Sequence, residues 1–162
     1  MTVNEIDALV RRGESDTLEF KKTTGQLSRA AETICAFLNG HGGIVVFGVT
    51  PDKEIVGQTV SDSTLQDVAQ CLKRFEPPAP VQLQRIALPD SAHELLVLRS
   101  DASHEIRPFT IDGRPYERVG STTSVMPQEK YQRLLLDHHN AGRTCRHRVR
   151  WKSWTGKRSS RQ

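Results

Sequence analysis

The segment Gly42-Gly43-Ile44-Val45-Val46-Phe47-Gly48-Val49 is an apolar run without alternating polar residues. Such a run is typical of a strand that is buried on both faces of a sheet. The turn residues Pro51-Asp52-Lys53 follow it, and Ile55-Val56-Gly57 is predicted to pair back on it.

The chain before this strand supplies two helices and a second strand. Helices are predicted over residues 5–12 and 27–38, and a short alternating strand over residues 17–21. In that short strand, Leu18 and Phe20 share one face, and Thr17, Glu19 and Lys21 share the other. The polar face places a carboxylate and an ammonium two residues apart.

The chain after the buried strand is richer in β-structure. A helix is predicted over residues 63–75, stopped by Pro77-Pro78-Ala79-Pro80. The following elements are a hairpin of 81–88 with 94–99, a hairpin of 107–111 with 115–119 around Asp112-Gly113-Arg114, and a last helix over 127–138. The fold class is therefore α+β, a mixed sheet of about six strands flanked by about four helices.

The net charge of the chain is concentrated in its last residues. Residues 141–162 hold eight Lys or Arg and no acid, so the total of +4 becomes −4 on residues 1–140. Both tryptophans also lie in this segment. We predict a domain over 1–140 and a basic, flexible tail over 141–162. The tail is either a nucleic-acid-binding arm or the end of a truncated chain, as in a fragment of a longer transcriptional regulator.

Several protein classes are not expected from this composition. No apolar run approaches the ~18 residues of a membrane-spanning helix, and the N-terminus lacks the features of a signal peptide. Three cysteines are too few and too scattered for a disulfide framework or a zinc site. A P-loop is absent from the sequence, so an ATPase is not expected. We expect a cytoplasmic protein without a membrane partner.

An ordered series of short motifs resembles the Schlafen-type AlbA-like domain family, over about residues 10–137. The series consists of Glu14-Ser15-x-x-x-Glu19-Phe20-Lys21, Ala36-Phe37-Leu38-Asn39, Gly42-Gly43-x4-Gly48-Val49, Ile55-Val56-Gly57, Arg107-Pro108-Phe109 and Tyr116-x-Arg118-Val119-Gly120-Ser121. The resemblance implies a mixed sheet flanked by helices and a DNA-binding role, often within a regulator. It also implies a possible homodimer.

The same resemblance implies a metal site in the nuclease members of the family. In Schlafen nucleases, a Glu-x4-Glu pair and a later Asp hold a divalent metal that serves cleavage of tRNA or rRNA. Glu14 and Glu19 match the pair, whereas Thr50 stands where relatives carry the Asp, and Asp52 is the nearest substitute. Such a site would take Mg²⁺ or Mn²⁺, because carboxylate oxygens suit these ions. The alternative is that Glu14 and Glu19 are ordinary carboxylates, with Glu19 paired to Lys21 or to an arginine.

Two functions therefore remain in competition at the level of sequence. The first is nucleic-acid binding, to DNA or RNA, which needs no cofactor. Its candidate contacts are Lys21, Lys22, Arg107 and Arg118 in the domain, with Arg148, Arg150, Trp151 and Lys152 in the tail. The second is metal-dependent RNA cleavage by Glu14, Glu19 and Asp52. For Arg118, an ion pair with an acidic residue is the alternative to a phosphate contact.

Overall fold

The structure is a computed structural model that describes residues 1–89, 91–102 and 104–144. The helices are α1 (Val3–Arg12), α2 (Leu27–Asn39), α3 (Asp62–Leu72) and α4 (Gln128–Thr144), with a 3₁₀ turn η1 (Thr24–Gln26) before α2. The strands are β1 (Leu18–Lys21), β2 (Gly42–Phe47), β3 (Phe75–Glu76), β4 (Val81–Ala87), β5 (Glu94–Asp101), β6 (Thr110–Ile111), β7 (Tyr116–Val119) and β8 (Thr122–Val125). The predicted α+β class is confirmed.

A four-stranded mixed sheet in the order β1-β2-β5-β4 forms the centre of the domain. β1 runs parallel to β2, and β2–β5 and β5–β4 are antiparallel. The predicted buried strand is β2, whose Val45, Val46 and Phe47 are fully buried. Ile55 forms a single bridge with Val49, so the chain does turn back after β2 as the sequence predicts.

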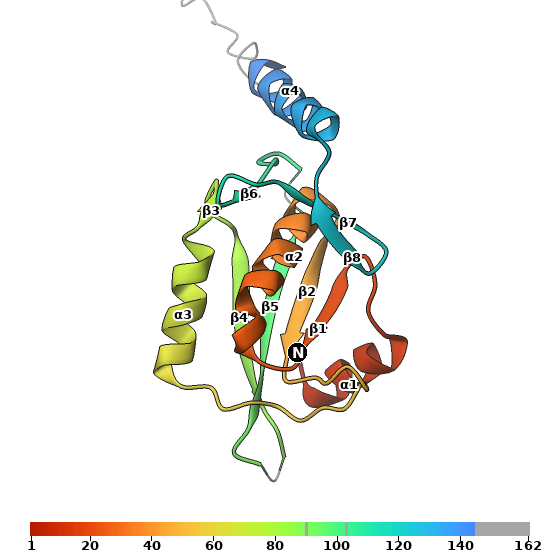
Figure 1. Ribbon diagram of the computed structural model, residues 1–162, viewed down its shortest axis with the longest axis vertical. Helices are drawn as coiled ribbons and strands as arrows, with labels where there is room; N and C mark the ends of the chain where they lie inside the picture. The colour runs from red at the N-terminus through yellow and green to blue at the C-terminus, as the bar shows by residue number, and fades with distance from the viewer. Residues whose placement is uncertain (90, 103, 145–162) are drawn as a thin grey trace, which may run out of the picture.

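Helices cover both faces of this sheet (Figure 1). On one face, α2 and α3 pack against Val45, Phe47, Leu96 and Leu98. On the other face, α1 buries Ile6 and Val10 against a second apolar cluster that contains Leu18, Val46 and Val97. Because successive side chains of β1 alternate between these layers, Leu18 and Phe20 face α1, and Glu19 and Lys21 face α2.

The number of strands and one hairpin differ from the sequence prediction. Among the residues that the structure describes, eight strands form three sheets, because β3 pairs with β6 and β7 pairs with β8 outside the central sheet. Ile111 and Arg114 form the bridge that closes the predicted Asp-Gly turn, but residues 107–111 do not pair with 115–119, so the predicted strand pairing is wrong. Instead, β7 turns at Gly120, with φ of 59°, onto residues 122–125, and Arg74 holds the Asp112 carboxylate of the Asp-Gly turn.

A buried hydrogen-bond network joins the end of α2 to the segment before β7. The Asn39 side chain donates to the carbonyls of Phe109 (2.9 Å) and Tyr116 (3.1 Å) and accepts from the Phe109 amide (2.7 Å). The Cys35 thiol donates to the same Phe109 carbonyl, and burial raises the pKa of that thiol to about 12. These contacts fix β7, and therefore Arg118, over α2.

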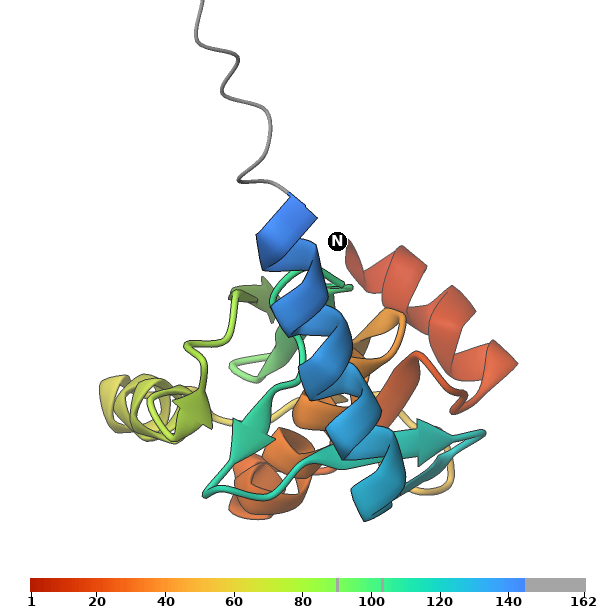
Figure 2. The same cartoon turned by 90° about the horizontal axis from the view of Figure 1, so that it is seen from above.

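The last helix leaves the body beyond the β7–β8 hairpin (Figures 1 and 2). α4 runs to Thr144, past residue 140, where the sequence placed the start of the basic tail. The candidate tail residues Arg148, Arg150, Trp151 and Lys152 lie outside the described residues. Within the described part of the chain, no helix has the length and apolar character needed to cross a membrane.

Candidate functional site

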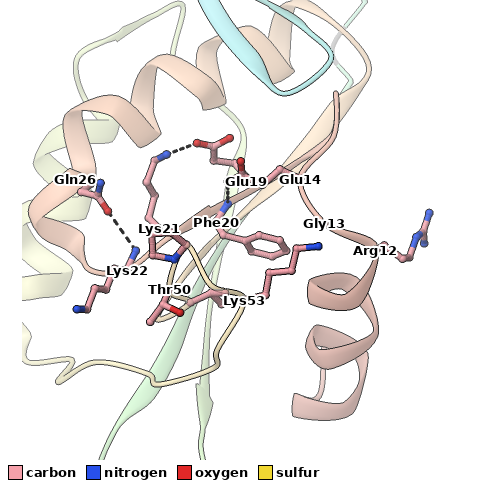
Figure 3. A pocket seen from close by; sticks show the side chains of 12 residues that line it. Arg12, Gly13, Glu14, Glu19, Phe20, Lys21, Lys22, Gln26, Thr50 and Lys53 are labelled. Carbon is pink, nitrogen blue, oxygen red and sulfur yellow. Dashed lines mark hydrogen bonds and ion pairs between the residues drawn. The ribbon is translucent and has the colours of Figure 1, made fainter.

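A cleft of about 550 Å³ opens beside the carboxyl end of β1 (Figure 3). Its walls come from the end of α1, from β1 with the residues that follow it, and from the turn after β2. The lining residues are Arg12, Gly13, Glu14, Glu19, Phe20, Lys21, Lys22, Gln26, Val49, Thr50, Pro51 and Lys53. Carboxyl ends of neighbouring parallel strands are a common place for ligands in open sheets, and β1 and β2 are the parallel pair of this sheet.

Three exposed cations line this cleft: Arg12, Lys22 and Lys53. Within the described residues, none of their side chains forms an ion pair or a hydrogen bond. Lys22 is held only through its backbone amide, which donates to Oε1 of Gln26 at 3.2 Å. The three charged groups are therefore available to a ligand in the cleft. We call Arg12, Lys22 and Lys53 the cleft cations.

Lys53 reaches the cleft from an unusual backbone position. Its φ is 67°, in the left-handed region that side chains other than glycine rarely adopt. The Lys53 amide donates to the Thr50 carbonyl at 2.9 Å, which closes the turn after β2. Its ammonium lies beside Gly13, where a Cβ on that glycine would be 3.3 Å from Nζ. The partial negative charge at the carboxyl end of α1 favours an ammonium there.

Glu19 lines the cleft, but its carboxylate is held between two cations. Its Oε1 pairs with Lys21 Nζ, and its Oε2 lies 2.6 Å from Arg118 Nη2. The exposed fractions of the Glu19, Lys21 and Arg118 side chains are 9%, 14% and 3%. Both oxygens of this carboxylate are thus already engaged in a nearly buried charge cluster. We call Glu19, Lys21 and Arg118 the charge triad.

All three guanidinium nitrogens of Arg118 donate hydrogen bonds inside the protein. Besides Glu19, its guanidinium donates to the carbonyls of Ser15 (2.8 Å) and Leu18 (3.2 Å) and to Thr123 Oγ1 (2.9 Å). It also lies over the Phe37 ring, 5.3 Å from the centroid. Of the two roles considered for Arg118 from the sequence, the structure shows the ion pair.

The remaining carboxylates do not join Glu19 in one site. Glu14 accepts the backbone amide of Phe20 at 2.9 Å, and Asp52 lies exposed on the turn without lining the cleft. Across residues 1–89, 91–102 and 104–144, no three His, Cys, Asp or Glu side chains are grouped so that they could hold a metal ion. The residues present do not fit the three-carboxylate Mg²⁺ or Mn²⁺ site that the sequence resemblance implies.

Comparison with known families identifies the fold that carries this cleft. Residues 14–127 match the family described as Schlafen, AlbA_2. The chain belongs to this family. The matched segment includes β1 and the turn after β2, and so it includes every part of the cleft except the end of α1. It also includes β7, which carries Arg118.

A solved structure shares the Schlafen AlbA_2 fold at low sequence identity. The crystal structure of the DIP2311 protein from Corynebacterium diphtheriae is 15% identical and superposes with a TM-score of 0.51, covering 74% of this chain. This chain corresponds to 23% of the length of that protein. Among curated proteins, no sequence matches this chain.

The cleft of this Schlafen AlbA_2 chain contains only some of the residues singled out in the sequence. Glu14, Glu19, Lys21 and Lys22 line it, whereas Arg107 lies elsewhere and donates to the Asn39 carbonyl at 3.3 Å. Arg12, Phe20 and Lys53 are the lining residues that sequence reasoning missed as site residues. Arg12 resembles an ordinary charge at a helix end. The one available signal for Lys53 was a lysine in a turn position that favours Gly, Asn or Asp.

Proposed function

We propose that this Schlafen AlbA_2 domain binds nucleic acid by its phosphate backbone, at the cleft beside β1. The observation that carries the proposal is the set of cleft cations, whose side chains form no ion pair among the described residues. Residues 1–140 are acidic overall, so a general positive field of the domain does not account for binding. A local cluster of cations against a −4 background is instead the arrangement expected of a specific phosphate site.

Lys and Arg side chains gain affinity for a phosphate backbone mainly by releasing condensed counter-ions. Each phosphate contact contributes roughly 0.7 to 0.9 to the slope of log K against log salt concentration. Membership of the Schlafen AlbA_2 family also supports the proposal, since that family carries a DNA-binding description. In the basic tail, Arg148, Arg150 and Lys152 would add phosphate contacts, and Trp151 would add base stacking.

Removing two cleft cations should weaken binding selectively. In the full chain, Lys22→Ala with Lys53→Ala is expected to lower the affinity for a fluorescent DNA or RNA oligonucleotide by about tenfold or more at low salt. The slope of log K against log salt concentration should become shallower by the contribution of about two phosphate contacts. The matched control is Lys73→Ala with Arg133→Ala, which removes two exposed cations outside the cleft. Fluorescence anisotropy across a salt series measures both quantities.

Two outcomes of this experiment would contradict the proposal. Equal losses in the cleft variant and the control variant would mean that charge alone, not the cleft, governs binding. Cleavage of the oligonucleotide or of tRNA with Mn²⁺, abolished by Glu19→Gln while binding persists, would favour the metal-dependent RNA endonuclease. We propose binding without cleavage, because the charge triad occupies both oxygens of Glu19.

Lys53→Gly should weaken nucleic-acid binding without lowering the stability of the fold. Glycine adopts positive φ without the ~1–2 kcal/mol cost that other residues incur, although it loses more entropy on folding. The variant is therefore expected to be as stable as the wild type or more stable by up to about 1 kcal/mol, yet to bind nucleic acid more weakly. Chemical denaturation and anisotropy on the same preparation test this pair of effects. Unchanged affinity would remove Lys53 from the interface.

A further inference from the structure

The shape of the cleft restricts which form of nucleic acid can enter it. Its volume of about 550 Å³ is in the range of pockets that enclose a small ligand. A duplex carries its phosphates on a convex outer surface, and proteins read it with a helix or a two-stranded ribbon that enters a groove. A concave cleft of this size would meet a duplex only at its rim, whereas one or two nucleotides of a single strand fit inside.

Phe20 provides an aromatic surface within this cleft. It is the one aromatic residue among the lining residues, and it is half-buried on the α1 side of β1. Figure 3 shows the Lys53 side chain beside its ring, whereas the Lys22 and Arg12 side chains stand farther off on opposite sides and extend away from it. An aromatic ring with a cation beside it, in a cleft bordered by further cations, suits a single strand, because bases stack on the ring while cations contact the phosphates.

Single-stranded bases are available for this contact and duplex bases are not. In a duplex, each base is stacked on its neighbours, so a protein aromatic ring reaches a base only after the stack is opened. In loops, bulges and ends, unstacked bases lie free to stack on protein side chains. The position of Phe20 in the interior of the cleft therefore favours an unpaired segment.

We infer, on the basis of the proposed nucleic-acid binding, that the cleft binds a single-stranded segment, with one base stacked on Phe20 and the adjacent phosphate contacted by Lys53. Lys22 and Arg12, at the rim of the cleft, contact phosphates farther along the strand. Stacking on the ring tolerates any base, so the inference assigns preference for strand form rather than for sequence.

The test compares strand forms on the full chain at one salt concentration. The probes are a labelled 12-nucleotide DNA strand, the same strand annealed to its complement, and thymidine monophosphate as a competitor. The single strand should bind at least about tenfold more tightly than the duplex, and Phe20→Leu should weaken single-strand binding by roughly 5- to 100-fold. Leucine keeps an apolar group against the α1 cluster, and Tyr131→Leu, outside the cleft, is the aromatic control.

Each result has a definite meaning. Equal binding of single strand and duplex overturns the inference, even if Phe20→Leu fails to fold, and so does single-strand binding that Phe20→Leu leaves unchanged. Competition by thymidine monophosphate as effective as that of the unlabelled strand also overturns it, in favour of a nucleotide pocket. If the wild type binds none of these probes at low salt, nor a 12-nucleotide RNA strand, the proposed function itself fails. Sensitivity to Lys22→Ala without strand preference would leave the proposed function standing and the inference refuted.

Discussion

Gly42→Ala is expected to destabilise the protein by about 3 kcal/mol or more, a loss found when a special backbone position is also sterically blocked. Gly42 begins β2 with φ of 77°. A Cβ there would lie 2.7 Å from the Ser100 carbonyl oxygen and 2.8 Å from the Ala102 amide nitrogen. Both are backbone atoms at the end of β5 and beyond, so neither can move without disturbing the β2–β5 pairing. Urea denaturation followed by circular dichroism measures the loss.

Gly113→Ala is the matched control for that experiment. Gly113 has a similar φ of 73°, but nothing lies within 4 Å of the position that its Cβ would take. Its substitution should cost only the backbone preference, about 1 kcal/mol. If the two alanine variants lose equal stability, close approach of β5 to Gly42 is not what requires glycine at the start of β2.

Glu19→Gln is expected to cost about 3–5 kcal/mol, the usual penalty for leaving buried charges without a partner. The substitution removes the negative charge from the charge triad, while Lys21 and Arg118 remain largely shielded from water. Arg118 ties β7 and β8 to β1, so the loss should also loosen the hairpin. Hydrogen exchange at the amides of residues 116–125 would report that loosening separately from global unfolding.

Two companion variants identify the cause of the Glu19 effect. The control variant Asp101→Asn breaks an ion pair at the surface, in which the Arg99 side chain is 54% exposed and the Asp101 side chain 64%. Its loss should cost at most about 1 kcal/mol. Adding Lys21→Met to Glu19→Gln should restore part of the stability, because it removes one unpaired ammonium. If Glu19→Gln alone raised the stability, Glu19 would not stabilise the fold through Lys21 and Arg118. A gain in stability would instead be typical of a residue kept for a functional site, such as a metal site, at a cost in stability.

The sequence predicted the central fold because its signals are local. The apolar run before Gly48 defines β2, and the alternation over 17–21 places Glu19 and Lys21 on one face of β1. All four helices occur, with α2 and α1 close to their predicted bounds. β8 could not be predicted in the same way, because Thr122–Val125 is short, polar and mostly exposed. Its pairing depends on the turn at Gly120 and on contacts with β7 rather than on periodicity.

The candidate site was less predictable because its residues meet only in three dimensions. Arg118 contacts Glu19 across 99 residues of sequence, so no local pattern could decide between an ion pair and a phosphate contact. Lys53 approaches Gly13 only because its backbone adopts a left-handed conformation. Glu14 and Glu19 occupy the family positions, yet Glu14 lies before β1 and Glu19 within it, and their side chains contact different partners.

β1 is an outer strand of the central sheet, and its free side is already occupied by its own chain. Glu14 accepts the Phe20 amide, and the Leu18 carbonyl accepts from both Ser15 and Arg118. An open strand edge is a template on which other molecules add strands, which leads to aggregation. The first carboxylate of the family motif therefore occupies one hydrogen-bond donor of this edge, which makes the strand bordering the cleft a poorer template for an added strand.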